Sequence, residues 1–188
     1  SGLINEDLTI GAKTSSSVDL MANEGLGGMG VKLNGDGFIL TPEDLTKLDT
    51  TVRISGTKVI RPFYNGRDLA QRPRNVSVID FFGLDEKEVR TSHPELYQWV
   101  SAHVKPFRMA SSYDALKREW WLFGRQRAEL RDAVSTLRRL IATTRTSRHR
   151  IFTFLDSAVV FESKIVGIAL EDAFHLGVLS SSIHEEWA

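Results

Sequence analysis

The sequence predicts an α+β fold, with a mostly antiparallel β-sheet lobe and packed helices. Runs rich in β-branched and aromatic residues have the length of strands and follow one another across polar connections. Between these runs lie segments that begin with helix-capping residues or repeat apolar residues at helical spacing. The chain has 188 residues, of which 41% are hydrophobic, so it is long enough to bury one sizeable core.

The N-terminal part of the chain predicts an arm, a hairpin and a short helix. The first 25 residues are polar and glycine-rich, which favours a loop or an arm lying on another surface. In VKLNGDGFIL, residues 31–40, apolar residues alternate around Asn-Gly-Asp-Gly, which predicts a β-hairpin. Thr41 as N-cap and Pro42 at the first helical position predict a helix that ends near Leu48.

Two strands and two helices are expected next. TVRISGTKVIRPFY and VSVIDFF have the composition of strands, and they flank the polar loop NGRDLAQRPR. Residues 85–104 predict helix, with a break or a new start at Pro94.

The second half of the chain predicts one amphipathic helix, three strands and a terminal helix. In RAELRDAVSTLRRL and the residue that follows it, Leu130, Val134, Leu137 and Ile141 recur at helical spacing. The runs IFTFL, KIVGIAL and FHLGVL are β-rich and predict strands. LSSSIHEEWA predicts a capped helix.

The zero net charge of the chain hides a strongly basic block at residues 105–150. This block holds 12 lysines and arginines against 4 acidic residues, so it carries +8 and the remaining residues carry −8. Concentrated positive charge is typical of a surface that binds a nucleic-acid backbone. The alternatives are a solvated helix face and a basic face that binds an acidic protein.

Several other functions are not favoured by the residues. The chain has no cysteine, which excludes disulfides and thiolate zinc sites and suits a reducing, cytoplasmic location. No apolar run approaches the ~18 residues of a membrane span, so no membrane partner is expected. The GxGxxG pattern at residues 25–30 precedes an expected strand instead of following one, which argues against a nucleotide loop. The five histidines lack metal-binding spacing, so no metal site is expected.

One enzymatic alternative rests on the pattern D-x5-E-x-K. Asp156 and Glu162 could hold Mg²⁺ while Lys164 supports an attacking water, as in a small metal-dependent nuclease. The competing interpretation is a hairpin that carries ordinary surface charges.

Five segments, taken in order, resemble the target-recognition domain of MmeI-like enzymes, which are single-chain Type IIG/IIL restriction-modification DNA methyltransferases. The segments are KVIRPFYNGRDLAQRPRNVSVIDFFGL, HVKPFR, REWWLFGRQRAELRDAV, LRRLIATTRTSRHRIFTFLD and HLGVLSSSIHEEWA. The upstream segment NEGLGGMGVKLNGDGFILTPEDLTKL is similar to the family's connection between the methyltransferase core and the recognition domain.

The resemblance implies that residues 1–50 are a linker or arm joining a methyltransferase core, and that residues 51–188 recognise DNA. The expected partners are double-stranded DNA and the methyltransferase domain of the same parent chain. The parent would methylate adenine at N6 and cleave DNA, using S-adenosylmethionine and Mg²⁺. The fragment itself would hold no cofactor and perform no catalysis.

The segment TTRTSRHR, residues 143–150, lies where the family's base-choosing residues lie. Arg145 and Arg148 can each donate a fork of hydrogen bonds to guanine O6 and N7. The shorter polar side chains of the segment can contact bases or phosphates; these are Thr144, Thr146, Ser147 and His149.

The loop NGRDLAQRPR supplies further base-reading candidates, namely Asn65, Arg67, Gln71, Arg72 and Arg74. Its loop position favours contact with a partner, and the amides of Asn65 and Gln71 can pair with adenine. The alternative is a solvated turn in which Asp68 pairs with an arginine.

Four cations next to Pro, Phe or Gly are candidates for phosphate contacts, with plain surface charge as the alternative: Lys105, Arg108, Arg125 and Arg127. Trp120 and Trp121 are expected to pack in the core, because a reader of duplex DNA has little use for exposed indoles.

Overall fold

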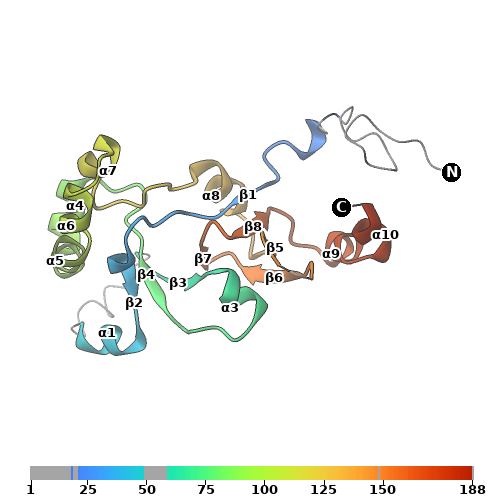
Figure 1. Cartoon of the computed structure of the whole chain (residues 1–188), viewed down its shortest axis with the longest axis horizontal. Coiled ribbons are helices and arrows are strands. Elements are labelled where there is room, and N and C mark those ends of the chain that lie inside the picture. The colour runs from blue at the N-terminus through green and yellow to red at the C-terminus, as the bar shows by residue number, and fades with distance from the viewer. Residues whose placement is uncertain (1–17, 19–20, 49–58, 148, 188) are drawn as a thin grey trace.

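A computed structural model of the chain describes residues 18, 21–48, 59–147 and 149–187. Two four-stranded sheets occupy the middle of an elongated molecule, and helices lie at both of its ends (Figure 1). The molecule is α+β with mostly antiparallel strands, as the sequence predicts.

The first sheet has the strand order β1-β8-β5-β6, and all its neighbouring strands are antiparallel. Its strands are β1 (Gly27–Met29), β5 (Arg139–Thr144), β6 (Phe152–Asp156) and β8 (Ile165–Ile168). Strands β5 and β6 form a hairpin that pairs Arg139 with Asp156 at one end and Thr143 with Phe152 at the other. The predicted strands in IFTFL and KIVGIAL are therefore present, and residues 145–147 and 149–151 lie in the hairpin loop.

The second sheet has the strand order β2-β4-β3-β7. Its strands are β2 (Ile39–Leu40), β3 (Ile60–Tyr64), β4 (Ser77–Ile79) and β7 (Val160–Phe161). Strands β3 and β4 are antiparallel neighbours, which confirms the two strands predicted on either side of the loop NGRDLAQRPR. Part of that loop is helical, because Asn65 caps the short helix α3 (Gly66–Ala70).

The hairpin predicted for residues 31–40 is wrong. Val31 bridges to Glu162, Lys32 bridges to Arg125, and β2 pairs with β4, so the two halves of this segment do not pair with each other. Asn34 and Gly35 have positive φ angles, and the 3₁₀ helix η3 (Asp36–Phe38) follows them. The chain crosses between the sheets here, because Phe38 and Leu40 are fully buried in a core that their own hairpin could not provide.

The helices lie mainly outside the sheets. They are η2 (Met21–Asn23), α1 (Pro42–Lys47), α4 (Glu86–Ser92), α5 (Pro94–His103), α6 (Lys105–Met109), α7 (Asp114–Arg118), α8 (Ala128–Val134), α9 (Ala173–Leu179) and α10 (Ser182–Trp187). The capping box between Thr41 and Asp44 confirms the predicted start of α1. The break at Pro94 is also as predicted.

Two secondary-structure predictions are corrected. The helix predicted over residues 127–140 ends at Val134, and Leu140 and Ile141 belong to the central strand β5. The strand predicted in FHLGVL is helix α9, whose N-terminus is capped by Asp172 through a 2.9 Å hydrogen bond from the amide of His175. In the first case, burial of Leu140 and Ile141 in the sheet outweighs local helix propensity. In the second case, the cap at Asp172 outweighs local strand propensity.

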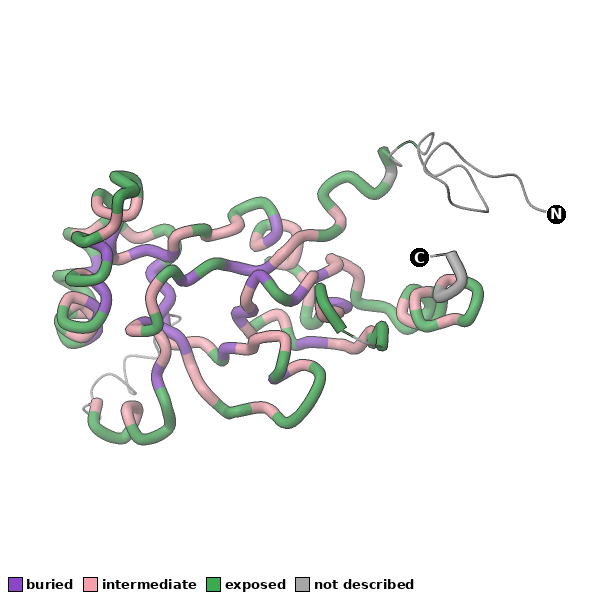
Figure 2. Tube along the Cα trace, in the orientation of Figure 1, coloured by how far each residue is buried: buried purple, intermediate pink, exposed green. Residues whose placement is uncertain are grey.

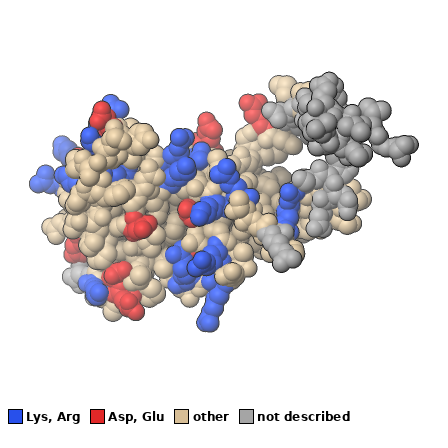
Figure 3. Space-filling view, in the orientation of Figure 1, with Lys and Arg blue, Asp and Glu red and all other residues tan. Residues whose placement is uncertain are grey.

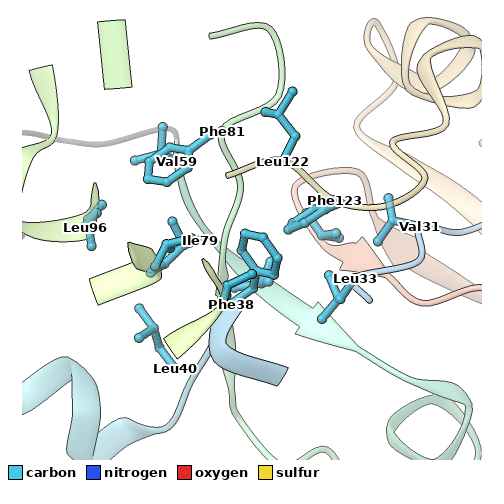
Figure 4. Close-up of a cluster of buried hydrophobic side chains, with 14 of the residues drawn as sticks. Val31, Leu33, Phe38, Leu40, Val59, Ile79, Phe81, Leu96, Leu122 and Phe123 are labelled. Atoms are coloured by element: carbon cyan, nitrogen blue, oxygen red, sulfur yellow. The ribbon is translucent and has the colours of Figure 1, made fainter. Parts of the chain in front are cut away.

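The buried side chains form two clusters. The larger one fills the space between the second sheet and helices α4 and α5, and Figure 4 shows Phe38, Ile79, Phe81 and Phe123 converging there. The smaller one lies under the first sheet, where Leu130 of α8 packs with Leu140 and Phe161. Figure 2 shows that burial is concentrated in these central parts, whereas α9 has no fully buried residue.

Strands from both sides of the expected domain boundary at residue 50 take part in both sheets. Strand β1 pairs with β8, and β2 pairs with β4. The described part of residues 1–50 is thus built into the same fold as residues 59–187. Residues 1–17, 19–20 and 49–58, where part of the arm and the start of the first strand were expected, lie outside the described residues.

Candidate nucleic-acid interface

The polar segment TTRTSRHR begins in β5, with Thr143 and Thr144, and continues into the loop of the β5–β6 hairpin. The amide of Arg145 donates a 2.7 Å hydrogen bond to the carbonyl of Lys164, which fixes the start of the loop. Ser147 Oγ donates to the carbonyl of His149 at 2.6 Å, which makes the loop compact. Arg145, Thr146, Ser147 and His149 are exposed, Thr144 is half-buried, and Arg148 lies outside the described residues.

The loop NGRDLAQRPR is held by its own capping interactions. Asn65 Oδ1 accepts hydrogen bonds from the amides of Arg67 and Asp68 at 2.9 and 3.1 Å. The carboxylate of Asp68 accepts in return from the amide of Asn65 at 2.8 Å. The exposed side chains of this loop include Arg67, Gln71 and Arg72.

Arg74 is not a free base-reading residue. Its Nε and Nη2 donate to the two carboxylate oxygens of Asp68 at 2.8 and 2.7 Å, and Asp68 is only 2% exposed. Burial acts to raise the pKa of Asp68, but hydrogen bonds from Arg74 and Asn65 hold it below its ordinary value. This is the alternative in which Asp68 pairs with an arginine of the loop.

The fold brings the two predicted base-reading segments together. Helix α3 packs against β5, and Gly66 lies so near Lys164 that a Cβ at position 66 would be 3.5 Å from the Lys164 Cβ. The same Cβ position would lie 4.0 Å from Thr144 Cγ2. Figure 3 shows lysine and arginine side chains gathered over the part of the molecule where α3 lies.

We call this surface the α3–hairpin face and define it by exposed side chains on α3, its following loop, the hairpin loop and the turn before β8. They are Arg67, Gln71, Arg72, Arg145, Thr146, His149 and Lys164. Sequence reasoning did not place Lys164 here, because nothing in the sequence indicates that the turn before β8 touches α3.

Three of the four phosphate candidates remain at or near the surface. Lys105 is half-buried, with its Nζ 4.6 Å from the centre of the Trp120 ring. Arg127 has a left-handed backbone and its Nε donates to the carbonyl of Gly30 at 3.2 Å. Arg125 is exposed, and it lines a cleft of about 360 Å³ together with Arg127 and the glycines of β1.

Arg108 does not fit the phosphate role expected of it. The residue is 0% exposed, and its Nη2 donates to the carbonyls of Leu33 and Leu122 at 2.7 and 2.9 Å. Its guanidinium also lies over the Phe38 ring. Arg108 is therefore a core residue that ties α6 to the segments that cross the middle of the molecule.

Both tryptophans of the WW pair pack as predicted. Trp120 is 3% exposed, and its Nε1 donates to the Glu86 carboxylate at 3.2 Å. Trp121 is half-buried and donates to the carbonyl of Leu84 at 3.2 Å.

A second, larger cleft of about 750 Å³ lies beside the crossing segment, and we call it the junction cleft. Its lining includes Lys32, Phe63, Asn65, Arg74, Glu162 and Ser163. The cleft is next to the α3–hairpin face in the fold, because Asn65 caps α3 and Ser163 directly precedes Lys164.

The three residues of the nuclease alternative take part in different local structures. Asp156 Oδ1 accepts from the amide of Ala158 at 2.7 Å and so closes the turn after β6. Glu162 lines the junction cleft, and Lys164 belongs to the α3–hairpin face. Within the described residues, no group of three His, Asp or Glu side chains is arranged to hold a metal ion.

Among the helices of the described residues, none is both long and apolar enough to cross a membrane.

No protein-family model matches this chain, and no curated protein matches it in sequence. It is similar in structure to the Type IIL restriction-modification enzyme MmeI, solved in complex with DNA. The match has a TM-score of 0.70 at 20% sequence identity and covers 98% of this chain. It covers 24% of the MmeI chain, so this chain spans about a quarter of that enzyme's length. The two share a fold over nearly the whole of this chain.

Proposed function

We propose that this chain is a sequence-specific recognition domain for double-stranded DNA within a restriction-modification DNA methyltransferase, and that it is not catalytic by itself. The observation that carries the proposal is the α3–hairpin face, where two polar segments far apart in sequence meet around exposed Arg67, Arg72 and Arg145. The similarity in fold to MmeI, whose structure was solved with DNA, supports the same function.

The face offers both kinds of contact that a sequence-specific reader needs. Arg145 and Thr146 lie at the tip of a two-stranded hairpin, an element that the major groove of DNA admits. Arg145 would donate a fork of hydrogen bonds to a guanine, and one such contact discriminates against the wrong base by about 1–3 kcal/mol. Gln71, Arg148 and His149 are further base-reading candidates of the same two segments.

The cations outside the hairpin tip would set the position of the duplex. Arg67, Arg72 and Lys164 flank the tip, and Arg125 and Arg127 lie by the glycine-rich β1. Each phosphate that a cation neutralises releases counterions, which makes binding weaker as salt rises.

The remaining parts of the proposal concern the parent protein. The methyltransferase domain of the same chain would be the second partner, with S-adenosylmethionine and Mg²⁺ as cofactors of the parent. The parent enzyme would transfer a methyl group to adenine N6 and cleave DNA. The recognition domain would position the duplex so that the target adenine reaches the methyltransferase domain.

The test measures binding of the whole chain to a DNA duplex by fluorescence anisotropy at several salt concentrations. We expect affinity to fall as salt rises. The triple variant Arg67→Ala, Arg72→Ala, Lys164→Ala should make the negative slope of log K against log salt shallower by about 2–3. The matched control replaces Arg90 and Arg118, exposed arginines of α4 and α7, and should leave the slope unchanged. Salt-independent binding, or equal losses in the two variants, would contradict the proposal.

Base reading is tested in the full-length parent by mapping its methylated sites. Replacing Arg145 or Thr146 by Ala should change the methylated sequence at one position if the side chain reads a base. Uniformly weaker methylation of the same sequence would instead identify a phosphate contact.

A further inference from the structure

The junction cleft holds polar side chains that the fold positions but does not use. Its volume of about 750 Å³ is in the range of roughly 300–1,000 Å³ typical of small-molecule sites. Ser163 is only 9% exposed and lines the cleft, yet its hydroxyl has no hydrogen-bond partner in the part of the chain that the structure describes. The hydroxyl is open to the cleft, so it can donate to or accept from a ligand there.

The turn that carries Glu162 and Ser163 is rigidly held. The amide of Glu162 donates to the carbonyl of Tyr64 at 2.9 Å, and that of Ser163 donates to the carbonyl of Val31 at 2.9 Å. The turn is closed by a 2.8 Å hydrogen bond from the amide of Ile165 to the carbonyl of Glu162. The Glu162 carboxylate, which lines the cleft, has no hydrogen bond or ion pair within the described residues.

Asn65 and Arg74, which also line the cleft, are fixed by side-chain hydrogen bonds. Because Asn65 Oδ1 accepts two backbone amides of α3, its Nδ2 is the free end of the amide. Arg74 is fixed through Nε and Nη2 on Asp68, which leaves Nη1 without a partner among the described residues. The cleft therefore presents an amide donor, a hydroxyl, a carboxylate acceptor and a guanidinium N–H. The Asn65 and Arg74 side chains among them are held in place before a ligand binds.

The charges and the apolar residue in the lining of the cleft limit which class of ligand fits it. Lys32 and Arg74 are matched by Asp36 and Glu162, and Arg74 is also paired with Asp68, so the cleft is not a simple anion site. The lining also includes the apolar residue Phe63, which is 3% exposed. A fitting ligand is a flat group with an edge that both donates and accepts hydrogen bonds, joined to an anionic group.

We propose that the junction cleft binds one nucleotide unit whose base carries an exocyclic amino group. The Glu162 carboxylate accepts from that amino group, as acidic side chains do with cytosine N4, and Asn65 Nδ2 or Ser163 Oγ serves an adjacent acceptor on the base. Lys32 holds the phosphate, which also accepts a hydrogen bond from Arg74 Nη1. The site does not depend on duplex recognition by the α3–hairpin face.

The test is a titration of the ¹⁵N-labelled chain with each of the four deoxynucleoside monophosphates, in which NMR records the chemical shifts of the backbone amides. We expect dAMP, dGMP and dCMP to shift the amides around Asn65 and Ser163, and dTMP, which lacks the amino group, to bind at least ten-fold more weakly. Equal binding of dTMP and dCMP would overturn the proposal. So would inorganic phosphate reproducing the nucleotide shifts at the same concentration, or shifts confined to another surface.

Variants identify the reading residue. Glu162→Gln replaces one acceptor oxygen by an amide donor, so it should weaken dCMP binding about ten-fold and reduce the preference over dTMP. Ser163→Ala should weaken binding of all the amino-bearing nucleotides. The matched control is Glu95→Gln, an exposed substitution on α5, which should change neither affinity nor preference. If Glu162→Gln behaves like Glu95→Gln, the cleft does not read the base.

The nucleotide can come from solution or from an unpaired position in DNA, and two duplexes distinguish the sources. A duplex with a bulged cytosine that binds more tightly than the paired duplex, with the advantage lost in Glu162→Gln, assigns the site to DNA. No such advantage, with dCMP still binding in the cleft, assigns it to free nucleotides. The paired duplex alone reports on the α3–hairpin face, so failure of either proposal is seen separately.

Discussion

Arg131 and Asp80 form a bidentate ion pair that joins the two halves of the molecule. Arg131 Nη1 and Nη2 lie 2.7 and 3.2 Å from the Asp80 carboxylate oxygens. Arg131 belongs to α8, which packs on β1 of the first sheet, and Asp80 directly follows β4 of the second. Asp80 is 6% exposed and is also approached by Arg61 Nη1 at 3.4 Å.

We expect Asp80→Ala to lower the free energy of unfolding by about 3–5 kcal/mol, because it leaves two half-buried arginines without their counter-charge. Urea denaturation followed by circular dichroism measures this loss. Asp132→Ala, an exposed change on the same helix α8, is the control and should stay within about 0.5 kcal/mol of the native chain. Equal losses in the two variants would show that the ion pair contributes nothing specific.

The burial of Arg108 predicts a loss of stability with no direct effect on DNA contacts. Arg108→Ala removes both hydrogen bonds to the carbonyls of Leu33 and Leu122 and leaves a cavity, at a cost of about 2–5 kcal/mol. At a temperature where the variant is folded, the salt slope of duplex binding should equal that of the native chain. Arg125→Ala should do the reverse, keeping stability and reducing the slope by about 0.9. A reduced slope in Arg108→Ala would restore the phosphate role.

The pairing of Asp68 with Arg74 predicts sensitivity to acid. The pKa of Asp68 in the folded chain lies below the ordinary value of 3.8, so folding favours the ionised carboxylate. The resulting stability is fully present above the unfolded pKa and is lost as pH falls through the lower, folded pKa. Asp68→Asn should flatten the fall in unfolding free energy below about pH 5, while lowering stability at neutral pH. An unchanged pH profile would refute the assignment.

Two glycines of the chain predict opposite effects of the same substitution. A Cβ at Gly30 would collide with the carbonyl oxygen of Phe161, so Gly30→Ala should cost about 3 kcal/mol by overpacking. Gly177 lies inside α9 with no atom within 4 Å of the position of a Cβ. Gly177→Ala should therefore raise the free energy of unfolding by about 0.5–1 kcal/mol. Thermal melts of the two variants compare the effects, and melting points shifted in the same direction would contradict this account.

Local signals in the sequence predicted elements where the cause is itself local. The cap at Thr41, the break at Pro94 and the strands around NGRDLAQRPR require only neighbouring residues, and all three are present. Predictions failed where distant segments compete for the same residues. The Asn34–Gly35 turn suggested a hairpin, but the residues after it pair with β4, which lies about forty positions further along the chain.

The candidate site shows the same division. Residue type and order indicated which segments carry polar and cationic side chains, because charge and hydrogen-bonding capacity are properties of single residues. Only the packing of α3 on β5 placed Arg67 near Arg145 and Lys164 at the same edge. Packing also placed Arg108 in the core, where no property of its immediate neighbours requires it to be.

The sequence by itself therefore determined the α+β class, the capped helices and the basic character of residues 105–150. The tertiary structure decided which cations of the chain face solvent, which are bound to Asp68, Asp80 or buried carbonyls, and where a cleft remains. The physical reason is that burial and pairing depend on contacts between residues far apart in sequence, and such contacts exist only once the two sheets and their helices have packed.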